Sequence, residues 1–217
     1  YINTWDVHPP LHYFVLHFWI KLAGDSEFTL RFVSVIFAVP LVPLVYQTGH
    51  LIAGRRVGLM AALITAPSPF LVYYAQYVQM YTMAATFALL AVYLVLRTLR
   101  RNGRGSRLEW LALLLAVLLN LYTLYYTAFV LIFAALLVMI GGWCVVRRGE
   151  NVVRFLAPYV AVAAVAALLY VPWLPTIMLL AGETGRGSWR TFTDLPTMLK
   201  QTWVAFSLGT TAYLQLE

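Results

Sequence analysis

An acid and an imidazole stand just before a rigid pair of prolines near the start of the sequence. The run is Asp6-Val7-His8-Pro9-Pro10, and an apolar segment follows it. Because proline is well tolerated in the first turn of a helix, we expect a helix to begin here. Such a turn presents free N–H groups and a positive dipole end, which suit a phosphate, and a histidine adds a titratable donor. The run is a candidate phosphate site, with a capping acid in a plain turn as the alternative.

A second group of polar side chains lies in an aromatic patch at residues 73–81. Its Gln76, Gln79 and Tyr81 are candidates for hydrogen bonds to a sugar. The alternative is a belt of aromatic residues at the boundary between membrane and water. Arg31 is a candidate phosphate ligand, because a guanidinium binds phosphate through two parallel hydrogen bonds. Anchoring at the membrane surface is the alternative for Arg31.

The sequence predicts no metal site and no cofactor. Two of the four histidines, His8 and His12, stand four residues apart, but two prolines lie between them and no acid completes a metal-binding pattern. No glycine-rich phosphate loop or nucleophile elbow is present. The one cysteine, Cys144, lies among apolar residues and is expected to be an inert thiol in the core.

The composition indicates a membrane protein. The 217 residues are 62% hydrophobic and 11% charged, and the mean hydropathy is +0.80. Because soluble domains are about 25% charged, this chain has too little polar surface to cover a water-facing globule. The net charge of +7 does not indicate a nucleic-acid partner, since the basic residues lie in short gaps between apolar runs. We therefore expect an all-α, polytopic bundle of transmembrane helices.

The apolar runs divide the chain into one transmembrane domain with two surface helices. Residues 9–22 form an apolar segment too short to span a bilayer, which needs about 20 residues, so we expect a surface helix after an extracytoplasmic loop within residues 1–31. Residues 175–217 should form a second such loop, with a surface helix near residues 195–208. Six spans are expected between them, within residues 32–174, at residues 32–52, 57–74, 82–99, 108–125, 127–146 and 152–173.

The basic residues orient the predicted spans. If residues 9–22 do not cross, one side of the membrane holds ten of the fifteen Lys and Arg residues with two acids, and the other holds five with six acids. The difference of +8 against −1 places the basic side in the cytoplasm. We therefore expect a multi-pass protein of the inner or plasma membrane. The run at residues 6–10 and the patch at residues 73–81 would both face the extracytoplasmic side.

Five runs of the sequence follow a known pattern, namely Asp6-Val7-His8-Pro9-Pro10-Leu11-His12-Tyr13, Ser26-Glu27-Phe28-Thr29-Leu30-Arg31, Ser68-Pro69-Phe70-Leu71-Val72-Tyr73-Tyr74-Ala75-Gln76, Tyr122-Thr123-Leu124-Tyr125-Tyr126 and Pro172-Trp173-Leu174-Pro175. In these runs the sequence resembles the protein O-mannosyltransferases and aminoarabinose-transferase-like enzymes, a family of integral-membrane glycosyltransferases of the C-type fold. The resemblance covers nearly the whole chain.

The resemblance implies transfer of a sugar, with inversion, from a polyprenyl-phosphate carrier to an extracytoplasmic acceptor of unknown identity. The partners would be this lipid-linked donor and the membrane. Asp6 would be a second acid of the catalytic site, and His8 would lie near the lipid phosphate. The family's presumed base lies in a loop expected to precede Tyr1. Since the chain opens without a methionine and ends within a pattern, we expect a fragment that is inactive alone.

Three positions depart from the family pattern. Many relatives carry Glu-Ala-Arg-Met-Tyr where this chain has Tyr77-Val78-Gln79-Met80-Tyr81, and Leu124 stands where a histidine is common. These departures leave a non-catalytic binder of polyprenyl-phosphate sugars as an alternative. A lipid or sugar transporter is another alternative, although the charged residues lie near span boundaries and no internal repeat is visible.

Overall fold

The computed structural model describes residues 8–183 and 194–207, and this part of the chain is helical without any strand. Asp6, Arg186 and Arg190 lie outside the described residues. The helices are α1 (Leu11–Ala23), α2 (Glu27–Ala53), α3 (Arg55–Thr65), α4 (Pro69–Ala75), α5 (Tyr81–Arg100), α6 (Arg107–Leu121), α7 (Thr127–Arg147), α8 (Val152–Tyr170), the 3-10 turn η1 (Val171–Trp173), α9 (Leu174–Glu183) and α10 (Leu195–Ser207).

The long helices confirm a polytopic helical bundle. Within the described residues, four helical segments are long and apolar enough to cross a membrane, namely α2, α5, α7 and the stretch Val152–Leu179. The pair α3 and α4 passes the same test together but is bent by 58° at its break, and would make a fifth span. Helix α6 has 15 residues, about 22 Å, less than the roughly 30 Å of a hydrocarbon core. All six predicted spans are therefore helical, but four or five are long enough to cross.

Local sequence explains where the helices begin. The hydroxyl of Ser26 accepts a hydrogen bond from the backbone N–H of Thr29 and caps α2. At the start of α6, the Ser106 hydroxyl accepts from the N–H of Glu109, whose carboxylate accepts from the N–H of Ser106. This reciprocal capping box fixes the point at which the chain turns back after α5.

Helix α5 lies at the centre of the bundle. Half of the residues in its apolar stretch are buried, against 17–22% in the other three long spans. Its Ala91, Val92 and Val95 form a core with side chains of α6, α7 and α8. On its other side, the hydroxyl of Thr86 donates to the carbonyl of Phe37 on α2, at 2.7 Å. The other long helices therefore expose apolar faces, as expected for helices that contact lipid.

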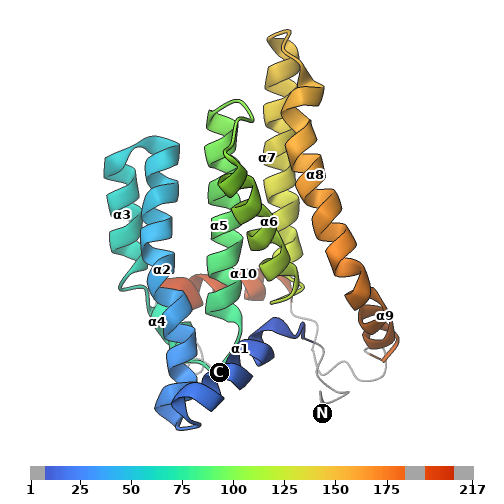
Figure 1. The fold of residues 1–217 in the computed structure, drawn as a ribbon. Helices are drawn as coiled ribbons and strands as arrows, with labels where there is room; N and C mark the ends of the chain where they lie inside the picture. Colours follow the sequence, from blue (N-terminus) through green and yellow to red (C-terminus); the bar gives the residue numbers. More distant parts are fainter. Residues whose placement is uncertain (1–7, 184–193, 208–217) are drawn as a thin grey trace.

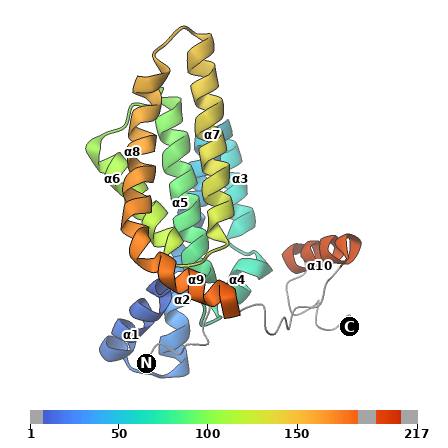
Figure 2. The ribbon, with the colours of Figure 1, turned by 90° about the vertical axis from the view of Figure 1, so that its right-hand side faces the viewer.

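The two ends of the bundle differ in charge and in architecture. The α2–α3, α5–α6 and α7–α8 connections share one end, which we call the basic end, and α1, α4, α9 and α10 gather at the other (Figure 1). At the basic end, hydrogen bonds join the connections to one another. Arg100 Nη2 donates to the carbonyl of Ile52 at 3.1 Å, and the Asn102 amide donates to Glu150. Helices α1 and α10 run across the long helices (Figure 2), and their assignment as surface helices stays a prediction.

Candidate functional site

The His-Pro-Pro segment, residues 8–10, is fastened to the turn that follows α6. Pro9 is fully buried, and α1 begins at Leu11, after Pro10. The backbone N–H of Leu11 donates to the carbonyl of Tyr122 at 3.0 Å. The predicted helix start is thus found, two residues later than the apolar run suggested. His8 is half-buried at this junction.

The burial of His12 was not predicted from the sequence. Its side chain is 3% exposed, and its Nδ1 has no hydrogen-bond partner among the described residues. Burial, and then the neighbouring His8, lower the pKa of His12 below its ordinary value, because a charged imidazole is poorly solvated here. His12 is therefore held in its neutral form, whereas His17 on the same helix is exposed.

A second segment of the site is the glutamine turn, residues 76–80, which connects α4 to α5. The hydroxyl of Ser34 on α2 donates to the carbonyl of Tyr77 at 2.6 Å and lies 3.4 Å from that of Gln79. The N–H of Gln79 donates to the carbonyl of Tyr77 at 2.7 Å, which tightens the turn. Ser34 is buried inside a predicted span, and sequence reasoning missed it.

The predicted sugar-binding side chains lie on this turn and at the start of α5. Gln76 is exposed and Gln79 half-buried, and neither amide group forms a side-chain hydrogen bond within the described residues. Tyr81 packs edge-to-face against Tyr74, with ring centres 4.9 Å apart. Two uncommitted amides beside aromatic rings offer the donors and flat faces that sugars need, although the same rings also suit an aromatic belt.

The tyrosine turn, residues 122–126, joins these segments. Leu124 packs with Met80 of the glutamine turn and with Ala84 of α5 in a small buried cluster. The hydroxyl of Tyr122 donates to the carbonyl of Leu169 at 2.8 Å, and Trp173 Nε1 donates to the Tyr125 hydroxyl at 3.2 Å. The motif segments at residues 8–13, 68–76, 122–126 and 172–175 therefore meet at the end opposite the basic end, which we call the site end (Figure 1).

Arg31 has a local partner at the start of α2. Its Nη2 lies 2.5 Å from Glu27 Oε1 in an exposed ion pair one helical turn apart. Exposed pairs of this kind are weak, about 0.3–0.5 kcal/mol, so a phosphate can compete for the guanidinium. Its assignment as a phosphate ligand stays a prediction.

A surface helix also reaches the site end. Phe206 of α10 stacks on Phe70 of α4, with ring centres 4.4 Å apart. The helix itself is largely exposed in the described structure. The described residues contain no group of three His, Cys, Asp or Glu side chains that could hold a metal ion.

Comparison with known proteins decides the family. The family model of dolichyl-phosphate-mannose-protein mannosyltransferases matches residues 7–175. The chain belongs to this family. No curated protein and no solved structure gives a significant match. As a member of this mannosyltransferase family, the chain is a multi-pass membrane protein of glycosyltransferase type, which confirms the resemblance seen in the sequence.

The family match covers the motif segments of the site end. It begins next to the His-Pro-Pro segment, passes through the glutamine and tyrosine turns, and ends at Pro175. The four motif segments that meet at the site end lie within these limits, whereas Asp6 and α10 lie outside them. The mannosyltransferase family therefore shares the part of the chain that builds the site end.

Proposed function

We propose that this chain carries the lipid-carrier part of a glycosyltransferase site that moves a sugar from a polyprenyl phosphate to an acceptor. The observation that carries the proposal is the junction at the site end. There the His-Pro-Pro segment bonds to the tyrosine turn through Leu11, and the glutamine turn packs on the same turn through Met80 and Leu124. Family membership supplies the reaction class.

In the proposed reaction the acceptor hydroxyl attacks the anomeric carbon from the face opposite the phosphate. The bond between this carbon and the phosphate oxygen breaks, and the polyprenyl phosphate leaves with the bonding electrons. The acceptor proton passes to a carboxylate, which we place in the family's acidic loop upstream of Tyr1. The product sugar therefore has the inverted configuration. Since a lipid phosphate is already a good leaving group, the enzyme must mainly activate the acceptor and stabilise the departing charge.

The residues have separate roles in this proposal. His8 and Arg31 would bind the phosphate, and Gln76, Gln79 and Tyr81 would bind the sugar or acceptor. Asp6 would act as a second acid. The charge asymmetry between the two ends supports an extracytoplasmic site end, because the arginine-rich connections are gathered at the other end of the bundle.

A non-catalytic binder of the same donor is the second candidate. Leu124 is buried in an apolar cluster at a position where a histidine is common in relatives. Such a cluster offers no group for proton transfer. The glutamine turn likewise carries no charged side chain, since Tyr77 and Gln79 replace the usual acid and base.

Turnover and binding of a defined donor distinguish the two candidates. The full-length protein is reconstituted in lipid vesicles with radiolabelled polyprenyl-phosphate mannose and a mixture of membrane and protein acceptors. We expect transfer of the sugar, and we expect NMR of the product to show an inverted anomeric configuration. Asp6→Asn should lower the rate by about 100-fold, as for a lost acid–base group, with donor affinity unchanged. Donor binding without transfer, in the presence of native membranes as acceptor source, would favour the non-catalytic candidate.

A further inference from the structure

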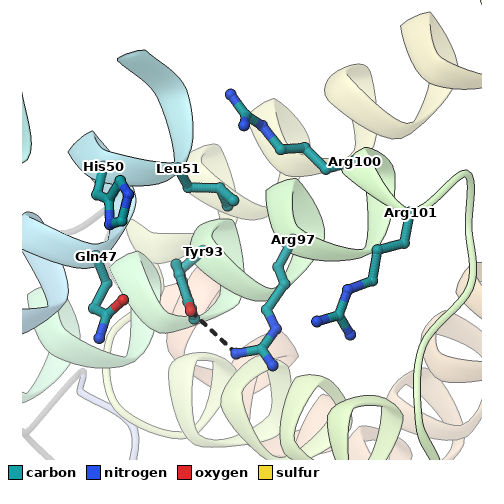
Figure 3. A pocket seen from close by; sticks show the side chains of 7 residues that line it. All are labelled: Gln47, His50, Leu51, Tyr93, Arg97, Arg100 and Arg101. Carbon is teal, nitrogen blue, oxygen red and sulfur yellow. Dashed lines mark hydrogen bonds between the residues drawn. The ribbon is translucent and has the colours of Figure 1, made fainter. Parts of the chain in front are cut away.

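A polar pocket opens at the basic end, at the far end of the helices from the site end. It has a volume of about 380 Å³ and lies between the last turns of α2 and α5 (Figure 3). Gln47, His50 and Leu51 line it from α2, and Tyr93, Arg97, Arg100 and Arg101 line it from the region of α5. Nothing in the proposed transfer reaction uses these residues.

The pocket carries an excess of positive charge. Glu109 at the start of α6 lies 2.7 Å from Arg97 Nε and 3.0 Å from Arg101 Nη1, and its carboxylate also caps Ser106. One carboxylate therefore faces two guanidinium groups. Arg100 forms no ion pair among the described residues and donates only to the carbonyl of Ile52. The three arginines and Glu109 together leave two positive charges at the pocket.

Further donors stand around these charges. Arg97 Nη1 donates to the hydroxyl of Tyr93 at 3.2 Å, which leaves the Tyr93 proton to donate elsewhere. The exposed side chains of Gln47 and His50 add an amide and an imidazole on the facing helix (Figure 3). Guanidinium, imidazole, amide and phenol groups are the donors that bind phosphate oxygens.

The pocket lies at the depth of a lipid headgroup. Helix α5 ends at Arg100 and α2 ends at Ala53, so the lining residues occupy the last two turns of helices long enough to cross a membrane. Exposed apolar side chains lie at the same end of the bundle: Ile52, whose carbonyl accepts the hydrogen bond from Arg100, is 60% exposed, and Val57 in the first turn of α3 is 43% exposed. Acyl chains can lie against these side chains while a phosphate occupies the pocket. Basic pockets between transmembrane helices bind anionic headgroups in this way.

We infer that this pocket binds the phosphate headgroup of an anionic phospholipid between α2 and α5. A phosphate on a soluble molecule has the same oxygen chemistry, but the apolar faces beside the pocket favour the lipid. The site is independent of the proposed transfer reaction.

Lipid titrations of the delipidated full-length protein in detergent test this site. The probes are short-chain phosphatidylglycerol and phosphatidylcholine of equal chain length, with glycerol 3-phosphate as the soluble arm, and binding is followed by native mass spectrometry. We expect phosphatidylglycerol to bind at least tenfold more tightly than either comparator. Arg100→Gln should weaken its binding about tenfold, the effect of one charge-assisted hydrogen bond. Arg97→Lys, which keeps the charge but loses the forked donors, should also weaken it.

Arg148→Gln is the matched control, because Arg148 is an exposed arginine of the basic end that does not line the pocket. It should change the affinity by less than about twofold. Equal losses in Arg148→Gln and Arg100→Gln would overturn the site and leave general attraction of lipid to basic residues. Equal binding of glycerol 3-phosphate and phosphatidylglycerol would overturn the lipid assignment. If Arg100→Gln fails to fold, Arg97→Lys decides, and unchanged binding in that variant would overturn the site.

Discussion

The hydroxyl of Ser34 on α2 donates a 2.6 Å hydrogen bond to the carbonyl of Tyr77 in the glutamine turn. These residues are 43 positions apart, and Ser34 is 1% exposed. The bond therefore fixes the position of the turn that carries Gln76 and Gln79 relative to α2. Thr86 of α5 provides a natural comparison, because its buried hydroxyl donates a similar hydrogen bond to the carbonyl of Phe37 on α2, farther from the turn.

Ser34→Ala should lower both stability and donor affinity. Loss of the hydroxyl removes one hydrogen bond to the Tyr77 carbonyl, which still accepts from the N–H of Gln79, so we expect a cost of about 0.5–1.5 kcal/mol in the free energy of unfolding. Thr86→Val should cost a similar amount but leave the affinity for polyprenyl-phosphate mannose unchanged. Thermal unfolding in detergent and a donor titration measure the two quantities. Equal donor affinity in both variants would show that Ser34 supports the fold and not the site.

His8→Ala in the full-length protein should weaken binding of a polyprenyl-phosphate sugar about tenfold, because it removes a donor to the phosphate. His17→Ala is the matched control, since His17 is an exposed histidine on α1. A carrier-lipid titration with the sugar-free polyprenyl phosphate and the full donor shows which part His8 contacts. An affinity in His8→Ala equal to that of His17→Ala would remove His8 from the site.

Acid should loosen the packing of α1. The folded protein holds His12 neutral with a lowered pKa, whereas the unfolded chain protonates it near the ordinary value of 6.5. The unfolded state therefore binds more protons in this range, so stability is full well above pH 6.5 and falls as the pH drops toward the lowered folded pKa. Unfolding followed between pH 8 and pH 5 should show this slope.

His12→Leu should remove that slope, because the titrating group is gone, while His17→Leu should retain it. The same acid slope in His12→Leu and the unmodified protein would show that other groups cause the loss of stability.

Cysteine labelling should place the α5–α6 connection in the cytoplasm. Arg104 is exposed there, so Arg104→Cys should react with an impermeant thiol reagent only from the cytoplasmic side. Gly103 is a poor choice, because its φ is +76° and a Cβ would lie 2.8 Å from Phe155 Cδ2. The prediction that Cys144 lies in the core is wrong, because its side chain is exposed on α7, and it must be replaced by Ala before the labelling.

Asp25→Cys in the same background is the control for the opposite face, since Asp25 is exposed between α1 and α2. It should label only from outside the cell. Labelling of Arg104→Cys from outside would reverse the topology and place the site end in the cytoplasm.

Hydrophobic runs predicted the helices well because burial in lipid requires long apolar segments with every backbone group paired. They predicted breaks poorly. Residues 57–74 read as one span, but the chain bends at Ser68, just before Pro69, because a proline restricts the residue before it. Residues 108–125 also read as one span, yet α6 ends at Leu121 and the tyrosine turn follows. Its tyrosines and leucine are apolar enough to extend the pattern without extending the helix.

The sequence predicted the motifs of the candidate site, whose roles stay predictions, but it did not predict the buried residues packed around them. His8 and the glutamines are polar residues beside turn signals, which mark them in a sequence. Ser34 donates to a residue 43 positions away, and His12 is almost fully buried, and nothing in the sequence around either residue indicates this. The basic pocket was also missed, because its arginines had been read only as orientation signals. A charge count identifies the side of the membrane but not the space between two helices.

Helix α5 connects the two ends of the molecule with a single rod. It runs from Tyr81, beside the glutamine turn, to Arg100 at the basic pocket, about 30 Å without an internal proline or glycine. Helix α2 beside it contains Pro40 and Pro43. Because no proline or glycine interrupts the helix, Tyr81 at the site end and Arg97 and Arg100 at the basic end stand on one continuous element. A movement of α5 as a rigid body would therefore displace residues of both ends together.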